Sequence, residues 1–180
     1  MKKARVGIVA LASLFMLIVS VAPVMAKAEK VPVVGLSFLM GGVPPERQWE
    51  TEGGILQLRN AWVTGTNYYW FDTTVLPPPP YNSPAPTFKF NVTAEMTGMV
   101  KVESGIAVQH WKSVLVYPLP ALGPEQGRFE GVMTVKNDGV LTTMHVVYQG
   151  SGRFEGQTLM VTGTKLSGQP GVIEGFLLTR

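Results

Sequence analysis

The sequence predicts an all-β protein, and more closely a small antiparallel β-barrel of eight strands. Apolar and polar residues alternate along several short segments, which is the pattern of strands with one buried face. Turn signals built from glycine, proline, asparagine and aspartate separate these segments at intervals of about 8–12 residues, as in sandwiches and barrels. No segment repeats apolar residues at the i, i+3, i+4, i+7 spacing of an amphipathic helix.

The clearest predicted strand is FKFNVTAEM, residues 88–96. Every second side chain in it is apolar, and the residues between them are polar, so one face would pack in the core while the other meets water. The residues predicted to face the core are Phe88, Phe90, Val92, Ala94 and Met96.

Shorter patterns of the same kind, bounded by turn residues, predict the remaining strands. Asn137-Asp138-Gly139 is a strong hairpin signal, because these residue types tolerate the positive φ that tight turns require. Gly168-Gln169-Pro170-Gly171 marks another turn. The further predicted strands are 55–64, 66–72, 99–103, 106–117, 129–136, 140–149, 157–166 and 172–179.

The N-terminus has the pattern of a cleaved secretory signal peptide, residues 1–26. A basic start is followed by an apolar run, and small residues precede a cleavage site after Ala26. The alternative is an uncleaved anchor, since the apolar run is just long enough to cross a bilayer. The chain has no cysteine, which excludes disulfides, thiolate catalysis and a lipid-modified cysteine. We therefore expect a secreted or cell-envelope protein.

Most of the positive charge belongs to this N-terminal segment. The chain carries 15 basic and 12 acidic residues, a net charge of +3, and three of the basic residues lie within residues 1–26. The remainder is close to neutral, which gives no support for nucleic-acid binding. Its length fits one domain, and we expect an irregular N-terminal arm at 27–51 followed by a single barrel domain at 52–180.

The phrase GRFEG occurs twice, at 127–131 and 152–156. We interpret each copy as the entry to a strand of the barrel. Because neighbouring side chains of a strand alternate in direction, Phe129 and Phe154 would point into the core, and the glutamate after each would point outward. Flanking glycines permit bends in the barrel wall.

The segment around the second copy resembles a known phrase. Gly150-Ser151-Gly152-Arg153-Phe154-Glu155-Gly156 is similar to the G-x-G-x-F-x-G phrase of the allene oxide cyclase and dirigent barrel superfamily, and residues 57–65, QLRNAWVTG, are similar to an early strand of its secreted relatives. Lipocalin-like (calycin) barrels use similar spacing. The resemblance implies an eight-stranded antiparallel barrel with a central cavity, often as a homo-oligomer. It transfers no catalytic residue.

The residues offer no catalytic constellation, metal site or cofactor motif. His110 and His145 are the only histidines, and they are not spaced as a ligand pair. We expect both to be partly buried structural residues. No G-x-S-x-G nucleophile motif occurs.

Ligand-binding candidates come from predicted inward faces and from the aromatic run at 67–71, which the proline-rich segment 76–86 follows. We interpret that segment as a stiff connector that covers one aromatic side chain, whereas docking to a proline-recognising partner is the alternative. Asn91 lies in an optional glycosylation sequon. The candidate ligand-binding residues are Arg59, Tyr69, Phe90, Val92, Met133 and Val135. For Arg59 the alternative is a position on the outward face.

Three functions fit an exported barrel without evident chemistry. The first is non-catalytic binding of a small apolar ligand in the lumen. The second is a cyclase or isomerase whose cavity folds a reactive substrate. The third is a structural component of the cell envelope. Beyond a ligand and further copies of the chain, no partner is expected, and contact with a membrane would come only from an uncleaved signal.

Overall fold

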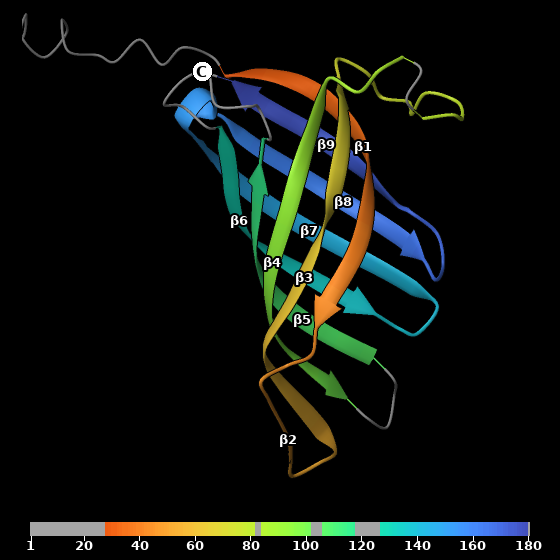
Figure 1. Ribbon diagram of the computed structural model, residues 1–180, viewed down its shortest axis with the longest axis vertical. Helices are drawn as coiled ribbons and strands as arrows, with labels where there is room; N and C mark the ends of the chain where they lie inside the picture. Colours follow the sequence, from red (N-terminus) through yellow and green to blue (C-terminus); the bar gives the residue numbers. More distant parts are fainter. Residues whose placement is uncertain (1–27, 82–83, 102–105, 118–126, 180) are drawn as a thin grey trace, which may run out of the picture.

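The computed structural model describes residues 28–81, 84–101, 106–117 and 127–179. These residues form nine β-strands and one short 3₁₀-helix (Figure 1). The elements are β1 (Glu29–Val43), β2 (Arg47–Thr51), β3 (Ile55–Phe71), β4 (Phe88–Lys101), β5 (Ile106–Val116), β6 (Arg128–Asn137), β7 (Leu141–Ser151), η1 (Gly152–Phe154), β8 (Thr158–Leu166) and β9 (Gly171–Thr179).

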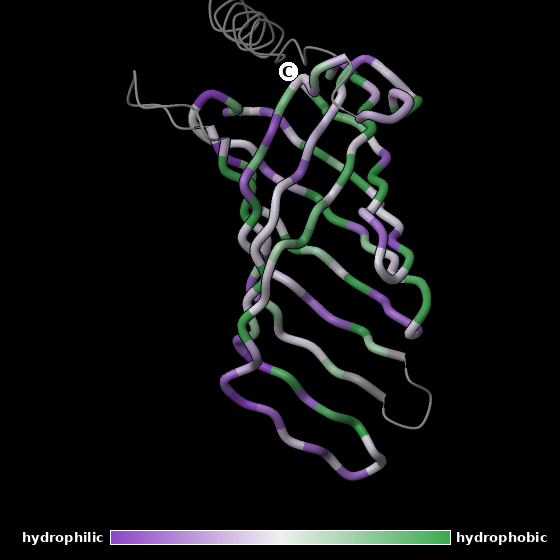
Figure 2. The backbone as a smooth tube through the Cα atoms, turned by 45° about the vertical axis from the view of Figure 1, so that its right-hand side comes forward, coloured by the Kyte–Doolittle hydropathy of each residue, from purple (hydrophilic) through white to green (hydrophobic). Residues whose placement is uncertain are grey.

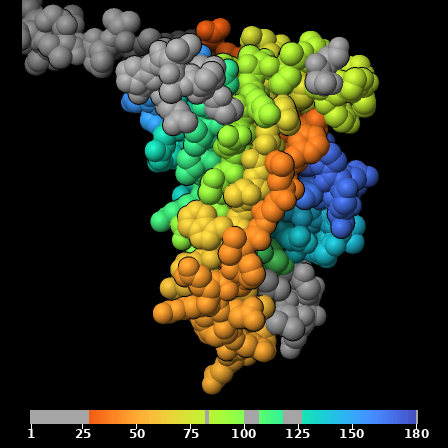
Figure 3. All heavy atoms as spheres, in the orientation of Figure 1, coloured from red at the N-terminus to blue at the C-terminus, as the bar shows by residue number. Residues whose placement is uncertain are grey.

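Eight of the strands close into an antiparallel barrel, which confirms the predicted fold class. Neighbours follow the order β1-β9-β8-β7-β6-β5-β4-β3, and β1 closes the ring by pairing with β3 as well as with β9. Purple and green alternate along the strands in Figure 2, as the period of two requires. The ninth strand, β2, pairs with β3 alone and extends that wall beyond the end of the barrel (Figures 1 and 3).

Strand β1 corrects the expectation of an irregular arm at 27–51. Most of this segment is a strand of 15 residues that closes the barrel. Its central part lacks polar alternation because both faces are covered there. Val33 packs inside the barrel, whereas Val34 and Leu36 pack on the outside against Trp70. A strand buried on both faces reads as a continuous apolar run rather than as an alternating one.

The outer cover comes from the proline-rich segment that follows β3. Leu76 packs against the outer cluster that contains Trp70, and the indole Nε1 of Trp70 donates a hydrogen bond of 2.9 Å to the carbonyl oxygen of Pro84. Tyr69, the neighbour of Trp70, points inward and is fully buried. The aromatic run is therefore divided between the lumen and the loop, as the connector interpretation predicted.

Two predicted breaks between strands are absent. Residues 55–71 form one strand that runs through Gly65, and residues 88–101 form another. Gly65 allows a close approach rather than a turn, since a Cβ there would overlap the carbonyl oxygen of Phe38 on β1. A bulge does interrupt β3 further upstream, where Asn60 has a φ of 56° and the pairing with β4 shifts between Leu58 and Ala61.

The two copies of GRFEG have different backbones. The first leads into β6, as predicted, but the second forms η1 in the connection between β7 and β8. The positive φ of Gly152 and Gly156, 61° and 77°, turns the chain at this point. Despite this correction, Phe129 and Phe154 are both buried in the core, as predicted.

Aromatic rings fill one end of the barrel. Phe154 lies within 4.7–6.2 Å, centroid to centroid, of its partners in this aromatic cluster, in stacked, tilted and edge-on arrangements. Such pairs each contribute roughly 0.5–1.5 kcal/mol beyond the area they bury. This end is therefore a packed core. The rings of the cluster are Phe88, Phe90, Tyr117, Phe129 and Phe154.

The Asn137-Asp138-Gly139 turn forms as predicted. Gly139 has a φ of 92°, and the carboxylate of Asp138 accepts hydrogen bonds from the backbone N–H groups of Val140 (3.0 Å) and Leu141 (2.8 Å). These two bonds, that of Leu141 first, lower the pKa of the Asp138 carboxyl.

The predicted signal peptide and the cleavage site at Ala26 lie outside the described residues. Within the part of the chain that the structure describes, no helix is long and apolar enough to cross a bilayer.

Candidate ligand cavity

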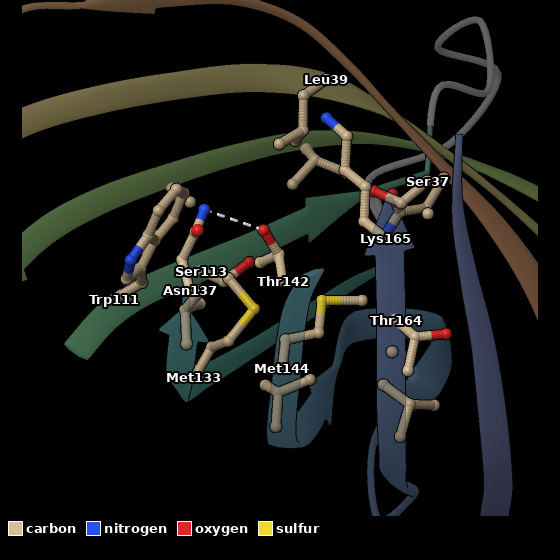
Figure 4. A pocket seen from close by; sticks show the side chains of 18 of the residues that line it. Ser37, Leu39, Trp111, Ser113, Met133, Asn137, Thr142, Met144, Thr164 and Lys165 are labelled. Atoms are coloured by element: carbon tan, nitrogen blue, oxygen red, sulfur yellow. Dashed lines mark hydrogen bonds between the residues drawn. The ribbon is translucent and has the colours of Figure 1, made fainter. Parts of the chain in front are cut away.

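The end of the barrel opposite the aromatic cluster contains an open cavity of about 310 Å³. Residues from β1 and from β3 to β9 contribute to its lining. Figure 4 shows Trp111, Met133 and Met144 projecting into this space from β5, β6 and β7. The volume is near the lower limit of the range of about 300–1,000 Å³ that small-molecule sites occupy.

The wall of the cavity is mainly apolar, and several of its side chains are small or flexible. Ala94 leaves room where the aromatic end carries rings, and the side chain of Met144 lies over Gly163. Methionine adapts to irregular shapes because its side chain is unbranched and polarisable. The principal apolar wall residues are Val92, Ala94, Trp111, Met133, Val135, Met144, Val146 and Val161.

The floor of the cavity, where it meets the core, carries four neutral polar side chains. Ser113 Oγ and Tyr148 Oη are 2.8 Å apart and share a buried hydrogen bond. Asn67 Nδ2 donates a hydrogen bond of 3.1 Å to Tyr69 Oη. We refer to Asn67, Tyr69, Ser113 and Tyr148 as the polar floor.

Burial governs the electrostatics of the polar floor. It raises the pKa of Tyr69 far above its usual range, and the neighbouring hydroxyl of Tyr148 raises it further. It also raises the pKa of Tyr148 to about 12, although the hydrogen bond to Ser113 acts in the opposite direction. Both phenols thus stay protonated and neutral at physiological pH.

One atom of the polar floor lacks a partner. The amide oxygen Oδ1 of Asn67 is buried and, among the described residues, has no hydrogen-bond partner. Asn67 as a whole is only 5% exposed. Leaving a buried acceptor unpaired costs roughly 1–3 kcal/mol, so an orphan of this kind requires an explanation.

The mouth of the cavity is formed by the end of β1 and by two turns. Leu39, Val140 and Leu166 are 44%, 69% and 47% exposed, so the rim carries exposed apolar side chains as well as polar ones. Asn137 Nδ2 donates a hydrogen bond of 2.9 Å to Thr142 Oγ1 and ties β6 to β7 at this rim (Figure 4). Of the described residues that line the cavity, Lys165 alone carries a charge.

Four of the six candidate ligand-binding residues line the cavity: Tyr69, Val92, Met133 and Val135. Phe90 points inward as well, but it belongs to the aromatic cluster that closes the other end.

Arg59 does not lie with them. It is exposed on the part of β3 that pairs with β2, and its guanidinium is 5.4 Å from the ring centre of Trp49. The bulge at Asn60 interrupts the alternation that would otherwise place Arg59 on the inner face. Asn91 faces outward and is exposed, on the polar face of β4 as predicted.

The sequence analysis did not single out Asn67, Trp111, Ser113 or Tyr148, although a signal for Ser113 was present. On β5 the inward residues are Gln109, Trp111, Ser113 and Leu115, so Ser113 is a small polar residue within an otherwise bulky face. A buried polar residue at such a position is more informative than an exposed apolar one.

The histidines do not contribute to this cavity. His110 and His145 are both exposed on the outer surface, which corrects the expectation that they are partly buried. Each ring Nδ1 faces a threonine hydroxyl on the next strand, Thr134 at 3.5 Å and Thr162 at 3.4 Å. Across the described ranges, no group of three or more potential metal-ligating side chains is brought together.

The comparisons identify no relative: no family model matches the sequence, and no curated protein or solved structure matches it.

Proposed function

We propose that the protein is an exported, non-catalytic binding protein that holds a small apolar ligand in this cavity. The observation that carries the proposal is the contrast between the two ends of one lumen. Aromatic rings pack the first end, whereas mainly aliphatic and small polar side chains, together with Trp111, surround an open space of about 310 Å³ at the second. Apolar concave sites with a few convergent polar groups are typical of small-molecule binding.

The polar floor supports binding over acid–base catalysis. Efficient general acids and bases have a pKa near the working pH. Burial raises the pKa of Tyr69 and of Tyr148, away from the working pH, so each phenol becomes a weaker acid. A cyclase or isomerase that only confines a reactive substrate is the alternative, since such an enzyme needs little chemistry from its walls.

The export signal and the likeness to the allene oxide cyclase and dirigent barrels belong to the same proposal. An exported barrel of this kind would meet its ligand outside the cytoplasm or within the cell envelope. Copies of the chain would associate through the outer surface of the barrel, as the likeness implies.

Titration with a neutral fluorescent probe such as N-phenylnaphthylamine tests the proposal. We expect saturable binding with a rise in probe fluorescence. The inward variant Val135→Trp should abolish the signal by filling the cavity. Val132→Trp is the matched control, because Val132 lies on the same strand but is 64% exposed on the outside. Absence of saturable binding, or equal binding to the two variants, would refute this function.

A further inference from the structure

We infer that the ligand carries a neutral hydrogen-bond donor, such as a hydroxyl or an amide N–H, at its inner end, where Asn67 Oδ1 accepts the bond. This inference rests on the proposed function and specifies the chemical class of the ligand.

The free atom of Asn67 decides whether the ligand donates or accepts the hydrogen bond. Asn67 projects from β3 into the lining of the cavity, and its Nδ2 is already used by Tyr69 Oη at 3.1 Å. The atom that remains is Oδ1, which is buried and unpartnered among the described residues. An amide oxygen can only accept a hydrogen bond. A ligand group that satisfies it must therefore donate.

The residues around Asn67 also restrict the charge of the ligand's donor group. A cationic donor such as an ammonium group would need a counter-charge in this enclosed place, because burying an unpaired charge is costly. The floor holds only amide, hydroxyl and phenol groups, and the high pKa of each tyrosine prevents a phenolate from forming. Lys165, at the mouth, has the wrong sign to help. The donor is therefore neutral.

The hydrogen bond between Asn67 and Tyr69 also sets the orientation in which the ligand enters. Tyr69 is fully buried and holds the amide of Asn67 through the hydrogen bond to Nδ2, so Oδ1 is fixed before the ligand arrives. Above the floor the wall is apolar, with Val92 and Met133 among its residues. A ligand would thus enter with its polar group leading and its apolar body towards the mouth.

Calorimetric titration with three probes of similar shape tests the inference: naphthol, naphthalene and methoxynaphthalene. Naphthol can donate a hydrogen bond, methoxynaphthalene can only accept one, and naphthalene can do neither. We expect naphthol to bind on the order of 10-fold more tightly than either of the others, as a buried donor–acceptor pair predicts.

Asn67→Leu should remove this preference, because naphthol would then bind no more tightly than naphthalene to the same variant. Asn91→Leu makes the same change at an exposed position on the outer face of β4, away from the cavity lining, and should keep the preference. The comparison among probes on the unaltered protein stands even where a variant fails to fold.

The outcomes separate the two claims. Equal binding of naphthol and naphthalene, or equal binding of naphthol and methoxynaphthalene, would overturn the donor inference and leave the binding function intact. A naphthol preference that survives in folded Asn67→Leu would also overturn it. Failure of all three probes and of N-phenylnaphthylamine to bind would overturn the binding function itself.

Discussion

The ring of Phe129 stacks on the ring of Phe154, with their centroids 4.7 Å apart and their planes inclined by 23°. These are the phenylalanines of the two GRFEG copies. Phe129 projects from β6 and Phe154 from η1, so the two GRFEG copies contact each other at the closed end of the lumen. Its glycines are needed for this contact, since a Cβ at Gly127 would overlap the side chains of Arg153 and Phe154.

This stack predicts a large loss of stability on truncation. Phe154→Ala should lower the free energy of unfolding by about 3–5 kcal/mol, because it empties a buried site among rings. Urea denaturation would measure the effect. Glu155→Ala, at the exposed neighbouring position, should change it by less than about 0.5 kcal/mol. A cost below about 1 kcal/mol for Phe154→Ala would contradict the packing described.

The cover over β1 predicts a smaller loss. Trp70→Phe should destabilise the protein by roughly 1–3 kcal/mol, because it removes buried area and the hydrogen bond to the Pro84 carbonyl. Trp62→Phe is a matched control on the same strand, since Trp62 is 39% exposed. Equal thermal shifts in the two variants would show that the proline-rich segment does not stabilise the strand beneath it.

The buried tyrosine hydroxyls predict alkaline sensitivity. The pKa of Tyr148 rises from 10.0 to about 12 on folding, so the folded state retains a proton that the unfolded state releases. Its contribution to stability is complete below pH 10 and is lost as the pH rises through about 12. Denaturation curves between these limits should therefore show falling stability. The double variant Tyr148→Phe, Ser113→Ala should show a weaker decline.

The charge at the mouth predicts selectivity among probes. Lys165→Met should weaken binding of an anionic apolar probe, anilinonaphthalene sulfonate, by about 2- to 5-fold at low salt, the range expected for a solvent-screened charge pair. Binding of neutral N-phenylnaphthylamine should not change. Lys136→Met, which removes an exposed lysine from the outside of β6, is the control. Equal losses for the two lysine variants would show that Lys165 acts only through net charge.

The candidate site was predicted in part, and the reasons differ between residues. Val92, Met133 and Val135 lie on strands whose local alternation reveals the inner face, so their place in the lining follows from period two. Alternation does not predict the position of Arg59, because the bulge at Asn60 shifts the register between Leu58 and Ala61. A bulge depends on pairing with a neighbouring strand, which local sequence does not reveal.

The sequence by itself determined most of the strands, the main turns and the inward direction of Phe129, because these depend on alternation and on the φ preferences of neighbouring residues. Phe154 is buried as predicted, but it projects from η1, so strand alternation is not the reason. The tertiary structure alone decided that β1 closes the barrel, since its two faces are covered by residues distant in the chain. It also decided where the lumen is packed and where it is open. The places of the packed end and the open end depend on the summed volumes of side chains from eight strands. The same packing leaves Asn67 Oδ1 without a hydrogen-bond partner among the described residues.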